Sequence, residues 1–195
     1  STTMKTVAGI VRPAAGRVLF EGKDVAGLPP YKLAHMGIAW VPEDRRVFRL
    51  LTVLENLRTG LERPGVTDQR KGALLDKVYA YFPVLAERRA QAAGTLSGGE
   101  QQMLAIARAM MLEPKIILLG EPTEGVMPRV VSQIKDIVHR LGADGVAILL
   151  VEQNVPLTLD ATTRCYIMEK GTVQHHAPSA ELRANHAVIR QYLGV

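Results

Sequence analysis

Four consecutive residues, Ser97, Gly98, Gly99 and Glu100, have the types and spacing best suited to chemistry in this sequence. Apolar residues recur at three- and four-residue spacing over 103–111, which predicts a helix that starts at the glycine pair. Free backbone N–H groups and the positive end of the helix dipole suit such a start to a phosphate. Ser97 is expected as the N-cap and Glu100 at N3, which is a capping box. Capping alone does not require two glycines, so we expect them to admit a phosphate or another chain's backbone at close range.

Glu121 is the second candidate, because it follows the apolar run 116–119 and Gly120. Such a run fits a parallel strand buried on both faces, and α/β proteins bind ligands at the carboxyl end of such strands. A carboxylate there can orient and polarise a water for attack on a phosphate. Taken alone, Glu121 is more simply a solvated acid at a strand end. Its spacing from 97–100 favours the functional interpretation.

The elements that position these residues are predicted from periodicity and from turn residues. Helices are expected at 1–9 with Gly9 as the stop, 28–36, 52–57, 76–89, 128–141, 155–161, 180–184 and 186–193. Buried strands are expected at 37–42, 115–119 and 146–151, a strand and turn at 17–24, and a hairpin of 165–168 with 172–174. A polar loop is expected at 43–46 and a turn-rich segment at 60–69. Strands alternating with helices predict an α/β fold with a largely parallel sheet.

Size and composition limit the class of protein. A chain of 195 residues fits one domain with room for a subdomain. The net charge of +5 favours a solvated basic face over an acidic partner or a membrane surface. The single Cys165 excludes an internal disulfide and fits a reducing compartment. The apolar runs are shorter than the roughly 20 residues that a membrane-spanning helix needs.

Two motifs together carry a resemblance to a known family. LSGGEQQMLAIARA, at 96–109, and IILLGEPTEG, at 116–125, resemble the signature helix and the Walker B segment of ATP-binding-cassette (ABC) ATPases. The resemblance implies a P-loop NTPase-like, mostly parallel sheet with a helical signature subdomain, lacking the N-terminal P-loop strand. It implies that 1–195 is a partial ABC ATPase domain, with the helical subdomain within 45–113 and the Walker B and C-terminal part at 114–195.

In that family two nucleotide-binding domains enclose two ATP molecules, each between the P-loop of one subunit and the signature of the other. The resemblance therefore implies that the signature residues contact the γ-phosphate on the partner and that Glu121 is the catalytic base. It also implies a catalytic role for Gln153, in the segment where many members have a histidine that contacts the γ-phosphate. Further implied roles are Mg²⁺ ligation by Ser1, nucleotide binding by Ser1, Thr2 and Glu43, and dimer or coupling contacts by Arg45, Arg46, Glu124 and Gly125. The basic pair 45–46 can meet phosphate, lie on the loop facing the membrane subunit, or be an ordinary exposed pair.

The segments 41–43, 45–48, 121–125 and 151–154 are similar to one ATPase subunit of importers for branched-chain amino acids and their urea and amide relatives. The implied cofactors are ATP and Mg²⁺. The implied partners are a second ABC ATPase subunit, identical or different, membrane permease subunits and, indirectly, an extracytoplasmic solute-binding protein, with no nucleic acid. The implied location is peripheral, on the cytoplasmic face of the inner or plasma membrane.

Two departures from the family pattern leave alternatives open. The P-loop glycines and lysine are expected to be missing from this sequence, and Gly120 stands where the family has the Walker B aspartate. The leading interpretation is an ATP-hydrolysing importer subunit. The second is a non-hydrolysing partner that lends its signature to ATP on another subunit. A chromosome-maintenance or DNA-repair ATPase is disfavoured, because only about 50 residues without sustained heptads separate Glu43 from Ser97.

Overall fold

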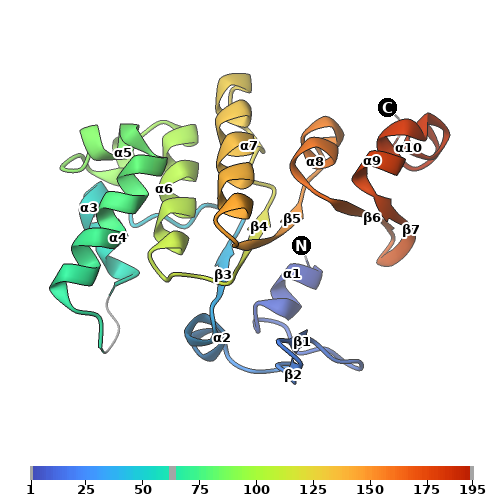
Figure 1. Ribbon diagram of the computed structural model, residues 1–195, viewed down its shortest axis with the longest axis horizontal. Coiled ribbons are helices and arrows are strands. Elements are labelled where there is room, and N and C mark those ends of the chain that lie inside the picture. Colours follow the sequence, from blue (N-terminus) through green and yellow to red (C-terminus); the bar gives the residue numbers. More distant parts are fainter. Residues whose placement is uncertain (1, 62–64, 194–195) are drawn as a thin grey trace. The chain divides into compact units, whose positions relative to one another are not determined.

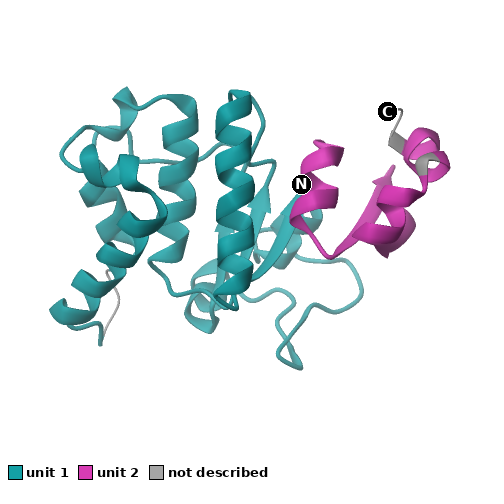
Figure 2. Ribbon diagram, turned by 45° about the horizontal axis from the view of Figure 1, so that its top comes forward, with its two compact units in different colours: residues 1–151 teal, residues 152–195 magenta. Residues whose placement is uncertain are grey.

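The computed structural model describes residues 2–61 and 65–193, which form two compact units. The first unit ends at Val151 and the second begins at Glu152 (Figure 2).

A three-stranded parallel sheet lies at the centre of the first unit (Figure 1). It consists of β3 (Ile38–Val41), β4 (Ile116–Gly120) and β5 (Ala147–Val151), in the order β3-β4-β5. Trp40 is in register with Leu118, and Leu118 with Leu149. The prediction of an α/β fold with a largely parallel sheet is confirmed. All three carboxyl ends lie at one edge of the sheet, which is where Glu121 follows β4.

Burial differs between the central and outer strands. Ile117, Leu118 and Leu119 of β4 are fully buried, as predicted for a strand covered on both faces. The same prediction is wrong for the strand expected at 146–151, because Leu149 of β5 is 37% exposed and Ala147 is exposed. Among the described strands β5 pairs with β4 alone, so its other side has no neighbouring strand to shield it.

The start of the chain packs on one side of this sheet. It contains α1 (Thr2–Val7), the hairpin of β1 (Leu19–Phe20) with β2 (Lys23–Asp24), and α2 (Pro30–Met36). Its buried core cluster consists of Met4, Ala8, Val25, Leu33, Ile38 and Leu118. The predicted stop at Gly9 is confirmed: its φ is +74°, and a Cβ there would lie 2.2 Å from the Leu28 carbonyl oxygen. This packing fixes α1 beside the sheet.

The helical part contains α3 (Val53–Thr59), α4 (Asp68–Tyr81), α5 (Pro83–Glu87), the short 3₁₀ helix η1 (Ala93–Thr95), α6 (Gly98–Met110) and α7 (Pro128–Ala143). The single helix predicted at 76–89 is wrong, because two helices occupy that region. The Thr67 side chain caps α4 by accepting from Arg70 N, which starts this helix inside the segment predicted to be turns. Pro83 cannot donate a backbone hydrogen bond and begins α5. Residues 62–64 of the predicted turn segment lie outside the described residues.

A polar cluster connects the end of α4 to the end of α7 through a hydrogen bond and an ion pair. Tyr81 Oη donates to Asp144 Oδ2 at 2.8 Å, Lys77 Nζ lies 2.9 Å from the same oxygen, and the Arg140 guanidinium lies 4.1 Å from the Tyr81 ring centroid. Burial and the bond to Asp144 raise the pKa of Tyr81 to about 12. The contacts of Lys77 and Tyr81 lower the pKa of Asp144. The cluster joins the end of α4 to α7, the helix that packs along β5.

The second unit contains α8 (Val155–Ala161), the antiparallel hairpin of β6 (Arg164–Glu169) with β7 (Thr172–Pro178), α9 (Ser179–Ala184) and α10 (His186–Leu193). The predicted hairpin is confirmed, although both strands are longer than expected. Its core includes Leu159, Cys165, Ile167 and Leu182. Asn154 Oδ1 accepts from Leu157 N at 3.0 Å and thereby caps α8. Across 2–61 and 65–193, none of the helices is both long and apolar enough to pass through a membrane.

Candidate functional site

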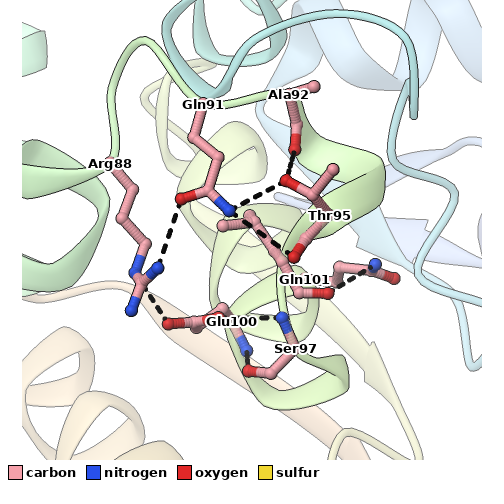
Figure 3. Close-up of polar contacts among 8 residues, drawn as sticks. Arg88, Gln91, Ala92, Thr95, Ser97, Glu100 and Gln101 are labelled. Atoms are coloured by element: carbon pink, nitrogen blue, oxygen red, sulfur yellow. Dashed lines mark hydrogen bonds and ion pairs between the residues drawn. The ribbon is translucent and has the colours of Figure 1, made fainter.

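The start of α6 has the capping box predicted from its sequence. Ser97 Oγ accepts from Glu100 N at 3.3 Å, and Ser97 N donates to Glu100 Oε2 at 2.8 Å. Arg88 Nε lies 2.9 Å from Glu100 Oε1, so the carboxylate is held from two sides (Figure 3). The box fixes the backbone of Ser97 in an extended conformation just before the helix.

The segment that leads into this turn is also fixed by hydrogen bonds (Figure 3). Arg88 Nη1 donates to Gln91 Oε1 at 3.2 Å, and Gln91 Nε2 donates to Thr95 Oγ1 at 2.8 Å. Thr95 Oγ1 in turn donates to the Ala92 carbonyl at 2.8 Å. Arg88 therefore connects this chain of contacts to Glu100, and the turn is positioned before any ligand arrives.

The capping box leaves two N–H groups at the helix start. A helix has four N–H groups without an intrahelical acceptor. In the part of the chain that the structure describes, Ser97 N and Glu100 N are bonded within the box. Within residues 2–61 and 65–193 no group accepts from the N–H groups of Gly98 and Gly99, which remain for an acceptor outside the helix. Together with the helix dipole, they can bind one anionic oxygen or a phosphate group.

The two glycines are needed for different reasons. A Cβ on Gly99, which is buried, would lie 2.6 Å and 2.9 Å from the methyl carbons of Val130 on α7. A Cβ on Gly98 would lie 2.8 Å from Arg45 Nη1, the end of a flexible side chain. Gly99 therefore allows α6 to pack closely against α7, whereas the missing Cβ of Gly98 makes room for the Arg45 side chain.

Replacing each glycine by alanine is expected to separate these two roles. Gly99→Ala should lower the free energy of unfolding by about 1–3 kcal/mol, because the stiff Val130 side chain cannot move away without disturbing α7. Gly98→Ala should change it by less than about 1 kcal/mol, because Arg45 can shift and alanine favours the helix. Urea denaturation of the wild type and both variants measures the difference in the free energy of unfolding, provided that the m-values agree. Equal losses would contradict the assignment of Gly99 to helix packing.

A small cavity lies at the carboxyl edge of the sheet, beside the ends of β3 and β4. Its volume is about 50 Å³, which suits a few water molecules rather than a nucleotide. Its charged lining consists of Lys5, Glu43, Asp44, Arg46 and Glu121. Two predicted site residues, Glu43 and Glu121, thus line one cavity. Sequence reasoning missed Lys5, and no motif marks it, because only the packing of α1 brings it to this edge.

Glu121 is held where β4 ends. Its N–H donates to the Val151 carbonyl at 2.8 Å, and its φ of +43° turns the chain away from the strand direction. A residue other than glycine pays a conformational cost there, and such costs are common at functional sites. The geometry therefore suits a carboxylate presented at the edge of the sheet, which is what a base acting on water requires.

Gly120 is not required by packing. A Cβ there would have its nearest contact at 3.5 Å, with Glu43 N, and the next at 3.6 Å, with the Val41 carbonyl oxygen. A side chain at 120 would fit at the cavity, and glycine supplies no metal ligand. Across the described ranges, 2–61 and 65–193, no group of three or more His, Cys, Asp or Glu side chains is arranged to hold a metal ion. The carboxylates that line the cavity can supply only part of a magnesium site. The remaining oxygen ligands would have to come from phosphate, water or other residues.

Three other residues were predicted to contact the nucleotide, and two of them are described by the structure. Ser1, the predicted Mg²⁺ ligand, lies outside the described residues. Thr2 is the exposed first residue of α1. Gln153 belongs to the second unit, where its N–H donates to Glu152 Oε2 at 3.1 Å just before α8. Their predicted roles, and the predicted limits of the helical subdomain at 45–113, stay predictions.

Three of the four predicted dimer or coupling residues, Arg45, Glu124 and Gly125, come close together from two loops. Arg45 Nη2 donates to the Glu124 carbonyl at 3.4 Å, and the same nitrogen lies 4.0 Å from the Cβ position of Gly125. Arg46 points elsewhere, with its guanidinium 5.5 Å from the Trp40 ring centroid. The structure thus places Arg45 and the 124–125 loop at the signature turn, and Arg46 at the cavity.

Comparison with known proteins gives consistent matches. The family described as "ABC transporter" matches residues 1–124. The chain is 44% identical over its full length to the high-affinity branched-chain amino acid transport ATP-binding protein BraG of Pseudomonas aeruginosa, covering 82% of that protein. It is 37% identical, again over its full length, to the lipopolysaccharide export system ATP-binding protein LptB of Haemophilus influenzae, covering 80% of it. A nucleotide-free ATP-binding cassette from an ABC transporter superposes with a TM-score of 0.85 at 27% identity, over 98% of this chain and 81% of that one.

Proposed function

The chain belongs to the ABC transporter family as an ATP-binding subunit, and we propose that it drives import of branched-chain amino acids or related small solutes. The similarity to BraG supports the solute class. LptB, an export protein, is similar at lower identity, so the solute and the direction of transport are the proposed part. In this proposal the subunit works peripherally at the cytoplasmic face of the membrane, with permease subunits and, indirectly, a solute-binding protein.

The observation that carries the proposal is the pre-positioned signature turn. Its capping box uses the N–H groups of Ser97 and Glu100 and leaves those of Gly98 and Gly99 for a ligand at the positive end of α6. Half a phosphate site of this kind becomes complete when another cassette presents the terminal phosphate of ATP. We assign the partner as a second ABC ATPase subunit, identical or different.

Hydrolysis in the proposed mechanism is carried out at the sheet edge. Glu121 orients the attacking water and accepts its proton, and Glu43 lies on the same cavity. Mg²⁺, held by phosphate oxygens, water and Ser1, would neutralise the charge on the transferred group. The chain's own contribution is to hold these carboxylates in place while α6 binds the phosphate on the partner.

Replacing Ser97 by arginine tests the signature role. Ser97→Arg removes the cap and places a bulky side chain between the turn and the partner's ATP, so ATP-dependent association with a P-loop-bearing cassette should weaken about 10-fold or more. Ser132→Arg, the same change on the exposed face of α7, is the matched control. Association measured by sedimentation with and without MgATP gives the result. Unchanged association of Ser97→Arg, with its helix content intact, would contradict the proposal.

A non-hydrolysing subunit that only donates its signature is the second candidate, and Gly120 is the observation in its favour. The two candidates differ in the same assembly. If this subunit hydrolyses ATP, a change at Glu121 removes turnover at its own site. If it only donates its signature, turnover belongs to the partner and responds to Ser97→Arg but not to Glu121→Gln.

A further inference from the structure

The side chains of Arg45 and Arg46 extend in different directions because of the backbone conformation at these two residues. Both residues have left-handed φ values, +59° and +48°. Arg46 Nε pairs with Asp44 at 2.9 Å, and its guanidinium lies over Trp40. Arg45 extends in another direction, toward the start of α6. Two consecutive left-handed residues cost on the order of 1 kcal/mol each, so the surrounding contacts must hold this conformation.

Contacts behind the pair supply that support. Arg108, near the end of α6, donates from Nη2 to the Arg46 carbonyl at 2.7 Å, and its guanidinium lies 5.1 Å from the Phe48 ring centroid. The fully buried Asn56 bonds both the N–H and the carbonyl of Phe48, each at 2.9 Å. The backbone of the 45–48 segment is therefore held beside α6, which places the flexible Arg45 side chain within reach of the signature turn.

The position of Arg45 is electrostatically unfavourable in the free chain. Its Nη1 lies 2.8 Å from the Cβ position of Gly98, at the positive end of the α6 dipole, where a cation is disfavoured. The carboxylate of that first turn, Glu100, is already held by Arg88 and by Ser97 N. The bond from Arg45 to the Glu124 carbonyl, at 3.4 Å, is long. A phosphate bound at the N–H groups of the helix start would lie within reach of this guanidinium and would compensate both positive charges.

From this arrangement we propose that Arg45 is a side-chain ligand for the phosphate bound at the signature turn, in addition to the N–H groups of Gly98 and Gly99. This inference rests on the proposed function, in which that phosphate is the terminal one of ATP held by a partner cassette. The planar guanidinium can donate two parallel hydrogen bonds to phosphate oxygens, which a lysine cannot. The sequence pair thus has two functions: Arg45 binds phosphate, and Arg46 packs on Trp40.

Inorganic phosphate is a suitable probe, because it binds the half-site without a partner. Titration of the ¹⁵N-labelled full chain at constant ionic strength should shift the amide resonances of Gly98 and Gly99 saturably. Arg45→Gln should weaken the apparent affinity about 10-fold or more, the effect expected for losing a charged hydrogen bond. Arg45→Lys should recover part of it. Arg17→Gln, which removes an equal charge at an exposed position, should leave the affinity unchanged.

Stability in the absence of phosphate provides a second readout. Because Arg45→Gln removes a cation from the positive end of α6, its melting temperature without phosphate should equal or exceed that of the wild type. Phosphate should raise the melting temperature of the wild type more than that of the variant. A purely structural Arg45 would give the opposite order, with the variant melting lower at every phosphate concentration.

The outcomes separate the two proposals. Saturable shifts of Gly98 and Gly99 with equal affinity in the wild type and Arg45→Gln would overturn the role of Arg45 and leave the half-site intact. No saturable shift in either protein, together with loss of ATP-dependent association only in the Ser97→Arg variant, would also overturn this inference while the proposed function stands. If ATP-dependent association is absent in the wild type as well, the proposed function itself fails.

Discussion

Glu121→Gln is expected to reduce ATP turnover of the assembled transporter by about 100-fold or more, with little change in KM for ATP. Glutamine is nearly isosteric with glutamate and can still hydrogen-bond a water, but it cannot accept the proton that the attacking water must lose. The strained φ of +43° and the bond to the Val151 carbonyl belong to the backbone, so the substitution should leave the sheet edge in place. Steady-state phosphate release over a range of ATP concentrations measures both constants.

Glu87→Gln is the matched control, because Glu87 is an exposed carboxylate on α5. It should retain the turnover of the wild type. A variant at Glu121 that turns over normally, in an assembly whose hydrolysis depends on this subunit, would exclude Glu121 as the base. A large rise in KM with unchanged kcat would instead assign it to ATP binding.

Asn56→Ala is expected to lower the free energy of unfolding by about 3 kcal/mol. Asn56 is fully buried, its Oδ1 accepts from Phe48 N at 2.9 Å, and its Nδ2 lies within 3.3 Å of the carbonyl oxygens of Phe48, Leu51 and Thr52. Alanine would leave Phe48 N–H without its acceptor in a site that water does not readily reach. It would also remove one donor from each of the three carbonyls, which keep the backbone N–H groups of Leu51, Ala93 and position 56 as donors. The loss should appear as a lower urea midpoint at an unchanged m-value.

Two comparisons sharpen this test. Asn56→Asp keeps an acceptor for Phe48 N but replaces the donor with an oxygen facing carbonyls, so it should be no more stable than the alanine variant. Ser132→Ala, at an exposed position of the same unit, should change stability by less than about 0.5 kcal/mol. If Asn56→Ala melts like the wild type, the 48–52 turn is held by other contacts, and the support proposed for Arg45 is weaker.

Local signals in the sequence were sufficient where the structure is local. The capping box at Ser97 and Glu100 was predicted because its four atoms lie within one helical turn. The helix stop at Gly9 and the hairpin around Lys170-Gly171 were predicted for the same reason. By contrast, the helix expected at 76–89 was divided at Phe82-Pro83, because proline lacks the N–H that a continuous helix needs there. The cap at Thr67 explains why the first of the two helices starts earlier than expected.

Longer-range features depended on packing. Nothing in the pattern of 97–100 distinguishes Gly99, which makes room for Val130, from Gly98, which faces Arg45. Likewise the exposure of β5 depends on which strands lie beside it, which its apolar sequence does not reveal. In both cases the deciding neighbour is more than 25 residues away along the chain.

The sequence by itself determined the family, the signature turn and its capping, and the place of Glu121 after a buried strand, because each depends on residues close together in the chain. Only the tertiary structure decided that Lys5, Glu43 and Glu121 line one cavity. It also decided that Arg45 reaches Gly98 of the signature turn while the neighbouring Arg46 packs on Trp40. Those arrangements depend on α1 packing beside the sheet and on Arg108 and Asn56 fixing the 45–48 segment along α6. The physical reason is that side-chain reach is a few ångströms, so only folding brings such distant residues within hydrogen-bonding distance of one ligand.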